Sequence, residues 1–531
     1  MTKSRPTAWL SRVVILISAA AILVASIALA LTQRPRTMRT AGDRPPGAGS
    51  EIRVGPNGNF QEALNRAGPD DVIVLESGSV YEGPFRLPRK TGNSYITIKS
   101  SRAAELPEGA RVGPGQSGLF AKLQAIRNGD IVITTDPGAH HYRFIGIEFS
   151  AAHAGLRSYD LVRFGDGRPA QTTIASVPHH LVIDRCYIHG FATQEVQRGL
   201  TLNSAETSVI NSYISDIHGK GYDTQAVAGW NGPGPFHIVN NYLEAAGENL
   251  MFGGADPSVP NLIPSDIEIR RNHFFKPLSW KVGDPSYAGI HWTIKNLLEL
   301  KLGRNVTIDG NVFENSWTDA QAGYAVLFTV RNQGGTAPWA IVENVTFSNN
   351  IVKGARSGIQ TLGMDYNHLS QQSTGLRVVN NVFDNIEHWC LTLNGFHNVT
   401  WEHNTLFQGN NNITFTSKQS LGFVYRNNLT VRSGFGFFGD GGTEGTAALT
   451  AYCPSYVFAG NVIVGASTTK YPAGNFYPAT LGEVQVNDYR LSTTSPFKGK
   501  GTDGKDPGAD MTSLLAAQAG SVSLPAGKKA L

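Results

Sequence analysis

The chain is poor in cysteine and in charged residues. Its 531 residues include only Cys186, Cys390 and Cys453, too few for a disulfide framework. Cys186 and Cys390 stand in strand-like runs, so we expect them to be small core residues. Charged residues make up 16% of the chain, and glycine and asparagine are plentiful. This composition favours short strands joined by tight turns over long helices.

Neither sign of charge dominates the body of the chain. The formal net charge is +4, but six basic residues and no acidic residue lie before residue 40. The remainder therefore has 39 basic against 41 acidic residues. This balance predicts that nucleic acid is not a partner. The sequence also lacks a helical zinc-protease motif, a nucleophile elbow and a phosphate-binding loop, which argues against those enzyme classes.

Long hydrophobic runs are also scarce, and the clearest one covers residues 13–31. Basic residues precede it, an order that is typical of an export signal. The run is also long enough to span a bilayer without being cleaved. We therefore predict a signal peptide or membrane anchor at residues 1–39 and a linker at residues 40–50. The body would be exported: secreted, periplasmic or anchored by an N-terminal transmembrane segment, with no other membrane contact.

One short phrase recurs along most of the chain. Its form is apolar, any, apolar, any, any, Asn, any, apolar, and one copy reads Val306, Ile308, Asn311, Phe313. Successive asparagines of the phrase are 23 to 39 residues apart. The other copies carry Asn241, Asn272, Asn350, Asn381, Asn404, Asn428 and Asn461. Self-similarity at this period is the signature of a solenoid.

The phrase describes a strand, a bend at the asparagine and a second strand. Asn tolerates the left-handed backbone region, and an Asn at the same place on every coil can stack through its amide. We therefore predict an all-β fold, a right-handed parallel β-helix over residues 51–490. A helix at Asn59–Ala67, with Asn59 as its cap, would cover the first coil. Residues 491–531 would wrap the last coil and end in a disordered tail from residue 518.

A third strand must precede each Asn phrase, and we name the sheet of these third strands sheet one. Examples are Leu250–Phe252, Leu297–Leu302 and Tyr324–Val330. Its outward side chains form the long surface on which polar groups vary from coil to coil. The longest loops flank it, and loops on one face of a solenoid usually carry the binding site.

With the repeat, the capping helix and the Asn column established, the chain resembles the pectate-lyase-like superfamily of right-handed parallel β-helices. The resemblance covers roughly residues 51–490. Gly247–Asp256 and Phe313–Asn332 look like segments of bacterial proteins described only as right-handed β-helix repeat proteins. The resemblance implies an acidic polysaccharide as partner, bound along sheet one and cleaved there, often with Ca²⁺.

A lyase of this kind removes the proton beside a uronate carboxylate and expels the linked sugar oxygen. A cation must neutralise the carboxylate, and a base must take the proton. Alternation with inward leucines points Glu299 and Lys301 outward, and Arg331 ends the next sheet-one strand. A Lys followed by an Arg one coil later is similar to the chondroitinase B and alginate lyase family. In that family acidic residues precede the Lys. In this chain Glu299 is such a residue, and Asn296 stands where a further acidic residue would be expected.

These considerations select the candidate site residues. Lys301, Arg331, Glu299 and Asp319 are the candidate catalytic residues. Lys295, Asn332, Trp317 and Asn394 are the candidate substrate-binding residues, Trp317 because exposed aromatic rings stack on sugars. Glu248, Asn249 and Asp256 supply the oxygen ligands that Ca²⁺ prefers.

The sequence thus favours an exported carbohydrate-active protein. The preferred activity is a polysaccharide lyase that cleaves acidic polysaccharide by β-elimination in a groove on sheet one. The alternative is a non-catalytic cell-envelope protein that binds glycans or partners through the same sheet. We expect a monomer. Paired aspartates of the polygalacturonase type do not appear on one sheet-one strand, so a hydrolase is less favoured.

Overall fold

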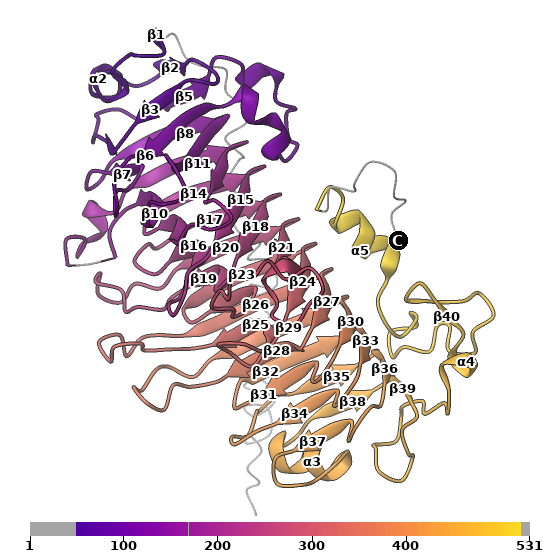
Figure 1. Ribbon diagram of the computed structural model, residues 1–531. Helices are drawn as coiled ribbons and strands as arrows, with labels where there is room; N and C mark the ends of the chain where they lie inside the picture. Colours follow the sequence, from indigo (N-terminus) through magenta and orange to yellow (C-terminus); the bar gives the residue numbers. More distant parts are fainter. Residues whose placement is uncertain (1–48, 168, 522–531) are drawn as a thin grey trace, which may run out of the picture. The chain divides into compact units, whose positions relative to one another are not determined.

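Short alternating strands stack coil upon coil in the computed structural model, which describes residues 49–167 and 169–521 (Figure 1). The described residues belong to a single structural unit. Three long sheets of parallel strands run along it, and neighbours in each sheet come from successive coils. The fold is therefore all-β and a right-handed parallel β-helix, as predicted.

Sheet one has 12 strands within the described part of the chain. They are β4 (Phe85–Leu87), β7 (Ile133–Thr135), β10 (Ser158–Phe164), β13 (Val196–Leu202), β16 (Gln225–Gly229), β19 (Glu248–Phe252), β22 (Leu298–Leu300), β25 (Tyr324–Thr329), β28 (Ser357–Leu362), β31 (Leu391–Leu393), β34 (Ile413–Phe415) and β37 (Phe437–Gly439).

Sheet two contains the first strand of each Asn phrase. Its strands are β1 (Glu51–Val54), β2 (Val72–Leu75), β5 (Ile96–Ser100), β8 (His140–Ile145), β11 (His179–Asp184), β14 (Ala205–Ile210), β17 (Phe236–Val239), β20 (Ser265–Arg270), β23 (Gly303–Asp309), β26 (Val342–Ser348), β29 (Thr374–Val379), β32 (His397–Glu402), β35 (Val424–Arg426) and β38 (Val457–Ala459).

Sheet three contains the second strand of each Asn phrase. Its strands are β3 (Val80–Glu82), β6 (Ala121–Ala125), β9 (Ile147–Ala151), β12 (Tyr187–His189), β15 (Tyr213–Ile217), β18 (Tyr242–Ala245), β21 (His273–Phe275), β24 (Val312–Ser316), β27 (Ile351–Ala355), β30 (Val382–Ile386), β33 (Thr405–Gln408), β36 (Leu429–Val431) and β39 (Val462–Val464).

The asparagines of the phrase form a buried column at the corner between sheets two and three. Asn311 Oδ1 accepts from the backbone N of Asn272 at 2.9 Å and from its Nδ2 at 3.0 Å. Asn311 Nδ2 donates to Asn350 Oδ1 at 3.0 Å and to Ile269 O at 2.9 Å. The predicted amide stack is therefore present, and it satisfies backbone groups that the bend leaves without ladder partners.

The left-handed residue of the bend is not the column asparagine, as the sequence analysis assumed. The residue before it has the positive φ, for example Arg271 at 51° and Asn349 at 54°. The column asparagines are not among the residues with a positive φ, and their buried side chains bond the next coil. The asparagine is thus selected for hydrogen bonding, and the turn is made one position earlier.

The predicted capping helix is α2, Phe60–Arg66. Asn59 caps it by accepting a hydrogen bond from the backbone N of Glu62 at 3.0 Å. Phe60, Ala63 and Leu64 are buried and belong to the main core, so the helix covers the open end of the first coils. Cys186 and Cys390 are buried and unpaired, in agreement with the expectation of core residues.

The segment after the last coil runs back along the Asn corner. The remaining elements are α3 (Thr446–Tyr452), the pair β40 (Val486–Asn487) and β41 (Arg490–Leu491), and the helices α4 (Leu481–Val484) and α5 (Met511–Ala517). Gln518 Nε2 donates to Asn311 O at 3.1 Å, and Arg111 donates to Ser521 O at 2.7 Å. The segment packs on the last coil through Leu491 and Phe497, as predicted, and then continues along the middle coils. Residues 518–521 are packed there and not disordered, because Gln518 and Ser521 are buried.

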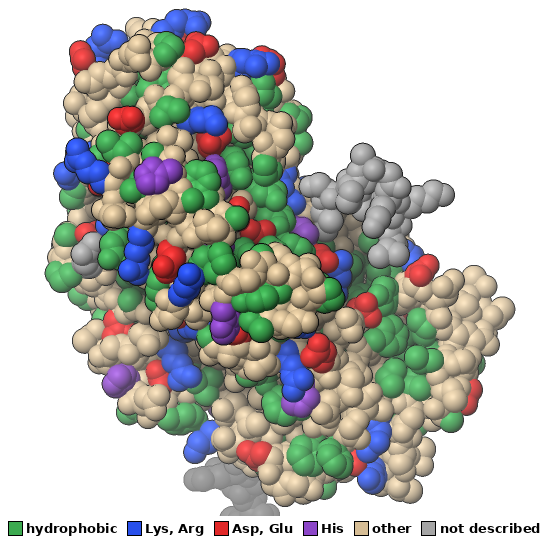
Figure 2. All heavy atoms as spheres, viewed as in Figure 1, with side chains coloured by type: hydrophobic (Ala, Val, Ile, Leu, Met, Phe, Trp, Pro, Cys, Tyr) green, Lys and Arg blue, Asp and Glu red, His purple; other side chains and the backbone are tan. Residues whose placement is uncertain are grey.

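The predicted signal or anchor lies outside the described residues, as does residue 522 onward of the predicted tail. Among the helices in the described ranges, none combines the length and the hydropathy needed to cross a membrane. Figure 2 shows Lys and Arg side chains interspersed with Asp and Glu on the visible face of the solenoid.

Candidate functional site

Sheet one carries a row of outward polar side chains at the start of its strands. In several coils two successive residues, such as Leu297 and Leu298, both belong to the main core. The residue before this pair faces outward. Strand pairing aligns these residues on consecutive coils, and we call them the polar row: Asp160, Arg198, Gln225, Glu248 and Asn296.

Glu248 belongs to the polar row and is fully buried. It accepts a hydrogen bond from Gln225 Nε2 at 2.8 Å, and its other oxygen is 3.6 Å from Lys295 Nζ. Lys295 also pairs with Asp223 at 2.6 Å and is 14% exposed. Burial, together with the Glu299 carboxylate, raises the pKa of Glu248 to about 7, although Lys295 opposes the shift.

Glu299 and Lys301 come from the neighbouring coil. Glu299 is buried, accepts a hydrogen bond from Asn296 Nδ2 at 3.1 Å, and lies 3.7 Å from Lys301 Nζ. The Lys301 side chain is 14% exposed. We call Asp223, Glu248, Lys295, Glu299 and Lys301 the lysine–carboxylate cluster. Two partly exposed ammonium groups thus lie over two buried carboxylates.

Arg331 lies at the edge of this cluster. Its backbone N donates to Lys301 O at 3.0 Å, so the two residues are neighbours on adjacent coils. Its guanidinium group pairs with Asp365 at 3.3 Å and is 36% exposed. Asn332 is less available than expected, since it is buried and its amide oxygen and nitrogen bind Ala337 N and Leu369 O. The structure therefore assigns Asn332 to loop packing and not to substrate contact.

The predicted metal set is not brought together. At the start of β19 the side chains of two successive residues, Asn249 and Leu250, both point inward. Asn249 therefore lies inside the coil. Its Oδ1 accepts from Lys276 Nζ at 3.0 Å. Asp256 accepts from the backbone N of Gly334 and Thr336 at 3.0 and 2.8 Å, so it orders a loop. Of the three predicted ligands only Glu248 belongs to the cluster.

Three further predicted residues lie apart from the cluster. Trp317 is 8% exposed and packs with Trp280 and Trp292, so it is not free to stack on a sugar. Asp319 binds His291 Nε2 at 2.6 Å and the backbone N of Ile294 at 3.2 Å. Asn394 follows β31, three coils from β22 and hence about 14 Å along the solenoid.

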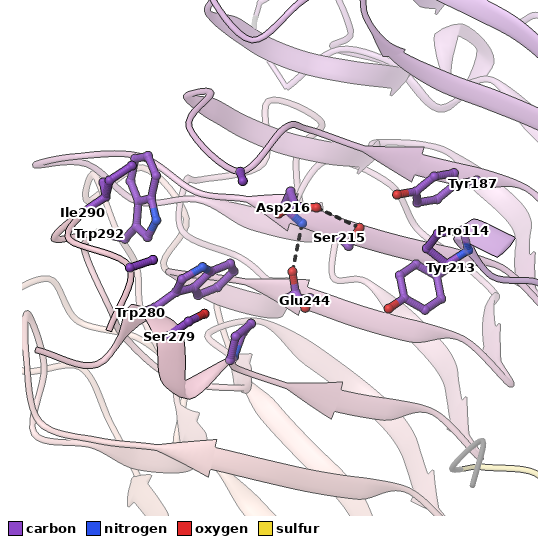
Figure 3. Close-up of a pocket in the computed structure, with 13 residues that line it drawn as sticks. Pro114, Tyr187, Tyr213, Ser215, Asp216, Glu244, Ser279, Trp280, Ile290 and Trp292 are labelled. Atoms are coloured by element: carbon purple, nitrogen blue, oxygen red, sulfur yellow. Dashed lines mark hydrogen bonds between the residues drawn. The ribbon is translucent and has the colours of Figure 1, made fainter. Parts of the chain in front are cut away.

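A pocket of about 320 Å³ lies on the neighbouring sheet three, and the sequence analysis missed it. In Figure 3, Asp216 and Glu244 meet at its centre, with Trp280 and Trp292 on one side and Tyr187 and Tyr213 on the other. The backbone N of Asp216 donates to Glu244 Oε1 at 3.0 Å, and Tyr242 Oη donates to Glu244 Oε2 at 2.6 Å.

Burial controls the electrostatics of this pocket. It raises the pKa of Glu244 to about 7, with the Asp216 carboxylate adding to the shift and the Tyr242 hydrogen bond opposing it. Burial likewise raises the pKa of Asp216. Two carboxyl groups beside aromatic rings can bind polar hydroxyl groups while apolar sugar faces pack on the rings.

The buried Lys276 connects this pocket with sheet one. Its ammonium group donates to the carbonyls of Ala245, Ala246 and Gly247 at 2.5, 2.9 and 2.7 Å. These residues form the corner between β18 and β19, just before Glu248. The lysine thus fixes the turn that separates Glu244 in the pocket from Glu248 in the cluster.

We expect Glu244→Gln to flatten the pH dependence of stability. In the folded protein the pKa of Glu244 is about 7, against 4.5 for an ordinary glutamate. The stability that this group contributes is therefore complete below pH 4.5 and is lost as the pH rises through about 7. Urea unfolding across that range should show a decline about 3 kcal/mol smaller in the variant. Glu387→Gln, at a surface ion pair, is the control; an equal change in both variants would contradict the assignment.

A local signal for the pocket was present in the sequence. Asp216 and Glu244 interrupt apolar strands at closely similar places after two successive Asn-phrase bends. Acidic residues in otherwise buried strands require a reason, and that reason is the pocket. The sequence analysis treated these strands as purely structural and so overlooked them.

Comparison with known proteins finds similarity to solved structures only. No protein-family model and no curated protein sequence matches the chain, whereas 61 chains of known structure do. An alginate lyase from a Paenibacillus species is 14% identical, with a TM-score of 0.37, covering 68% of this chain and 98% of its own. A mannuronic acid specific polysaccharide lyase from human gut microbiota is 12% identical, with a TM-score of 0.45, covering 82% and 92%.

A surface adhesin of Streptococcus pneumoniae is also similar. It is 12% identical with a TM-score of 0.42, and the match covers 71% of this chain and 87% of the adhesin. At identities this low the likeness concerns the fold alone. The chemistry must therefore be argued from the side chains of this chain.

Proposed function

We propose that this protein is an exported polysaccharide lyase that cleaves an acidic polysaccharide in the groove of sheet one. The observation that supports the proposal best is the lysine–carboxylate cluster. Lys295 and Lys301 keep part of their side chains at the surface, each 14% exposed, while Glu248 and Glu299 are buried beneath them. A surface of this kind attracts a polyanion, and the buried carboxylates hold the ammonium groups in place.

In the proposed reaction Lys301 takes the proton from the carbon beside the uronate carboxylate. The electron pair of that C–H bond forms the new C=C bond. The bond to the linked sugar oxygen breaks, and this oxygen leaves with the electron pair and takes a proton from water. Lys295 precedes Lys301 in the sequence, and Arg331 follows it on the next coil. Both supply positive charge for the carboxylate of the uronate. Their charge stabilises the developing enolate-like anion, which is the main requirement for this elimination.

The cluster also offers oxygen atoms that suit a calcium ion. Gln225 Oε1, Glu248 Oε1 and Asn296 Oδ1 are buried without a hydrogen-bond donor. They come from three consecutive coils of the polar row, and carboxylate and amide oxygens are the ligands that Ca²⁺ takes. Glu248, Glu299, Asn296 and Gln225 are the residues that would hold it. A bound Ca²⁺ would supply further neutralisation of the uronate carboxylate.

The direct test is product formation. The purified protein would be incubated separately with alginate, pectate and glycosaminoglycans, and the ultraviolet absorbance of the unsaturated product would be followed. A rise with at least one polymer supports a lyase, and its loss in a chelator with recovery in added Ca²⁺ supports the calcium site. If no polymer yields unsaturated or shortened chains, the catalytic proposal is wrong.

A glycan-binding protein without catalysis is the second candidate. The aromatic pocket around Asp216 and Glu244 favours it, since rings beside carboxyl groups are a common arrangement for holding a saccharide. This candidate predicts that the protein retains a polymer on an affinity gel without cleaving it. In that case Trp280→Ala should weaken retention, whereas Lys301→Ala should leave it nearly unchanged.

A further inference from the structure

Four histidines gather on sheet two, a different sheet from those that carry the polar row and the pocket. They form two His–His pairs, His140–His141 and His179–His180, at the start of β8 and β11. Strand pairing aligns His140 with His179. Continuing the register, His141, His180 and Glu206 occupy the same position on three consecutive coils. We call these five residues the histidine cluster.

The backbone presents the histidine rings to one another. His141, His180 and Glu206 all have a positive φ, of 59°, 55° and 48°. The rings of His141 and His180 stack with centroids 4.2 Å apart, and those of His140 and His179 stack at 4.8 Å. The same positive φ recurs at this position on later coils, at Asp266, Asn305 and Asn344, so it belongs to the corner of the coil. The strand register therefore places the histidine rings over one another.

Hydrogen bonding leaves ring nitrogens with lone pairs inside the cluster. The Nδ1 atoms of His179 and His180 are 2.7 Å apart, and those of His140 and His141 are 2.8 Å apart. Each contact holds one hydrogen, so one nitrogen of each pair must be a bare acceptor. His180 Nε2 lies 2.7 Å from Glu206, and donation to that carboxylate leaves His180 Nδ1 as the acceptor.

The arrangement of Glu206 behind His180 is the one found around metal-bound histidines. A ligating histidine usually donates its second ring N–H to a carboxylate, which fixes the tautomer and orients the ring. Tyr95 packs its ring against His141 at 5.2 Å and closes the column on the other side.

The distances are close to those that a metal ion requires. One ligand nitrogen each from His141, His179 and His180 lies within 4.8 Å of the others. Zinc binds imidazole nitrogen at about 2.0 Å, so two ligand nitrogens on one ion lie up to roughly 4 Å apart. The longest separation must therefore shorten by about 1 Å for all three nitrogens to bind one ion. His140 stacks on His179 and is not one of these three residues.

We propose that the histidine cluster binds a divalent transition metal ion, with His141, His179 and His180 as ligands and Glu206 as the residue that orients His180. Imidazole ligands select zinc, copper and nickel over calcium and magnesium, which prefer oxygen. The ion would displace a shared Nδ1 hydrogen and tie β8 to β11, with Glu206 linking β14. The site is separate from the proposed lyase activity and does not depend on it.

The test uses the full chain without an affinity tag, freed of metal by a chelator and then dialysed. Zn²⁺ binding would be measured by calorimetry, and Co²⁺ would report nitrogen ligands by its visible absorption. We expect one equivalent of Zn²⁺, no calorimetric competition from Ca²⁺ at this site, and a higher melting temperature with Zn²⁺. A wild-type protein that binds no Zn²⁺, or binds it without the Co²⁺ signal, would overturn the proposal.

Variants separate this site from other histidines. His141→Ala with His180→Ala should abolish the Co²⁺ absorption and the Zn²⁺ equivalent. Glu206→Gln keeps the shape of the side chain and should weaken Zn²⁺ binding by about 10- to 100-fold. His153→Ala, at an exposed histidine outside the cluster, should bind as the wild type does. If Glu206→Gln and His153→Ala have the same affinity as each other, the assigned role of Glu206 is wrong, even where the double variant fails to fold.

Discussion

Asn350→Ala is expected to lower the free energy of unfolding by about 4 kcal/mol. Asn350 Oδ1 accepts from Asn311 N at 2.8 Å and Asn311 Nδ2 at 3.0 Å. Its Nδ2 donates to Ile308 O at 3.0 Å and Asn381 Oδ1 at 3.1 Å. Alanine removes these four hydrogen bonds. It also leaves a buried N–H and a buried carbonyl unpaired, and each costs about 1–3 kcal/mol.

Urea unfolding of the purified variant measures this loss. Asn344→Gly is the matched control, because Asn344 comes from the same coil but is exposed, with a long amide contact to Asn305 at 3.3 Å. Glycine adopts the φ of 54° at this position without strain. We expect that control to change stability by less than about 0.5 kcal/mol. Equal effects of the two substitutions would mean that the column contributes no more than a surface amide.

Lys301→Ala is expected to reduce the rate of polysaccharide cleavage by about 100- to 10,000-fold, the usual effect of removing a general base. Binding of the polymer should fall much less, because Lys295 and Arg331 remain. Lys301→Arg is the more informative change. Arginine keeps the positive charge but does not give up its proton, so a base role predicts that this variant is also inactive.

Initial rates from the absorbance of the unsaturated product would test both variants, with binding measured separately. Lys353→Ala on sheet three is the control, since Lys353 pairs with Glu314 at a surface site away from the groove. An active Lys301→Arg variant would show that Lys301 acts only through its charge. An active Lys301→Ala variant would remove this residue from the mechanism altogether.

Parts of the site followed from the alternation of residues along one strand. Leu298 and Leu300 belong to the core, so Glu299 and Lys301 lie outward as expected. The side-chain type alone did not place Asn249, because two successive residues point inward at the start of several sheet-one strands. Nor did it place Asp256 and Trp317, because both lie in loops, where the path of the chain depends on contacts with distant segments.

Other groups escaped notice because their partners are a coil apart. Asp216 and Glu244 are 28 residues apart in the chain, and His140 and His179 share a register across a whole coil. The two His–His pairs can be seen in the sequence. Whether they lie next to each other depends on the register between coils, and the coils differ in length. Loops of different lengths separate the strands, so the phase cannot be counted from spacing alone.

The sequence by itself determined the β-helix, the capping helix and the Asn column, because each of these depends on a local pattern that repeats. A strand needs only alternation, and the corner needs only an amide at the same place on every coil. The tertiary structure alone decided which polar groups meet: Glu248 with Lys295, Asp216 with Glu244, and His180 with Glu206. Those contacts form between coils and across loops, where burial and hydrogen bonding between distant residues outweigh any local preference.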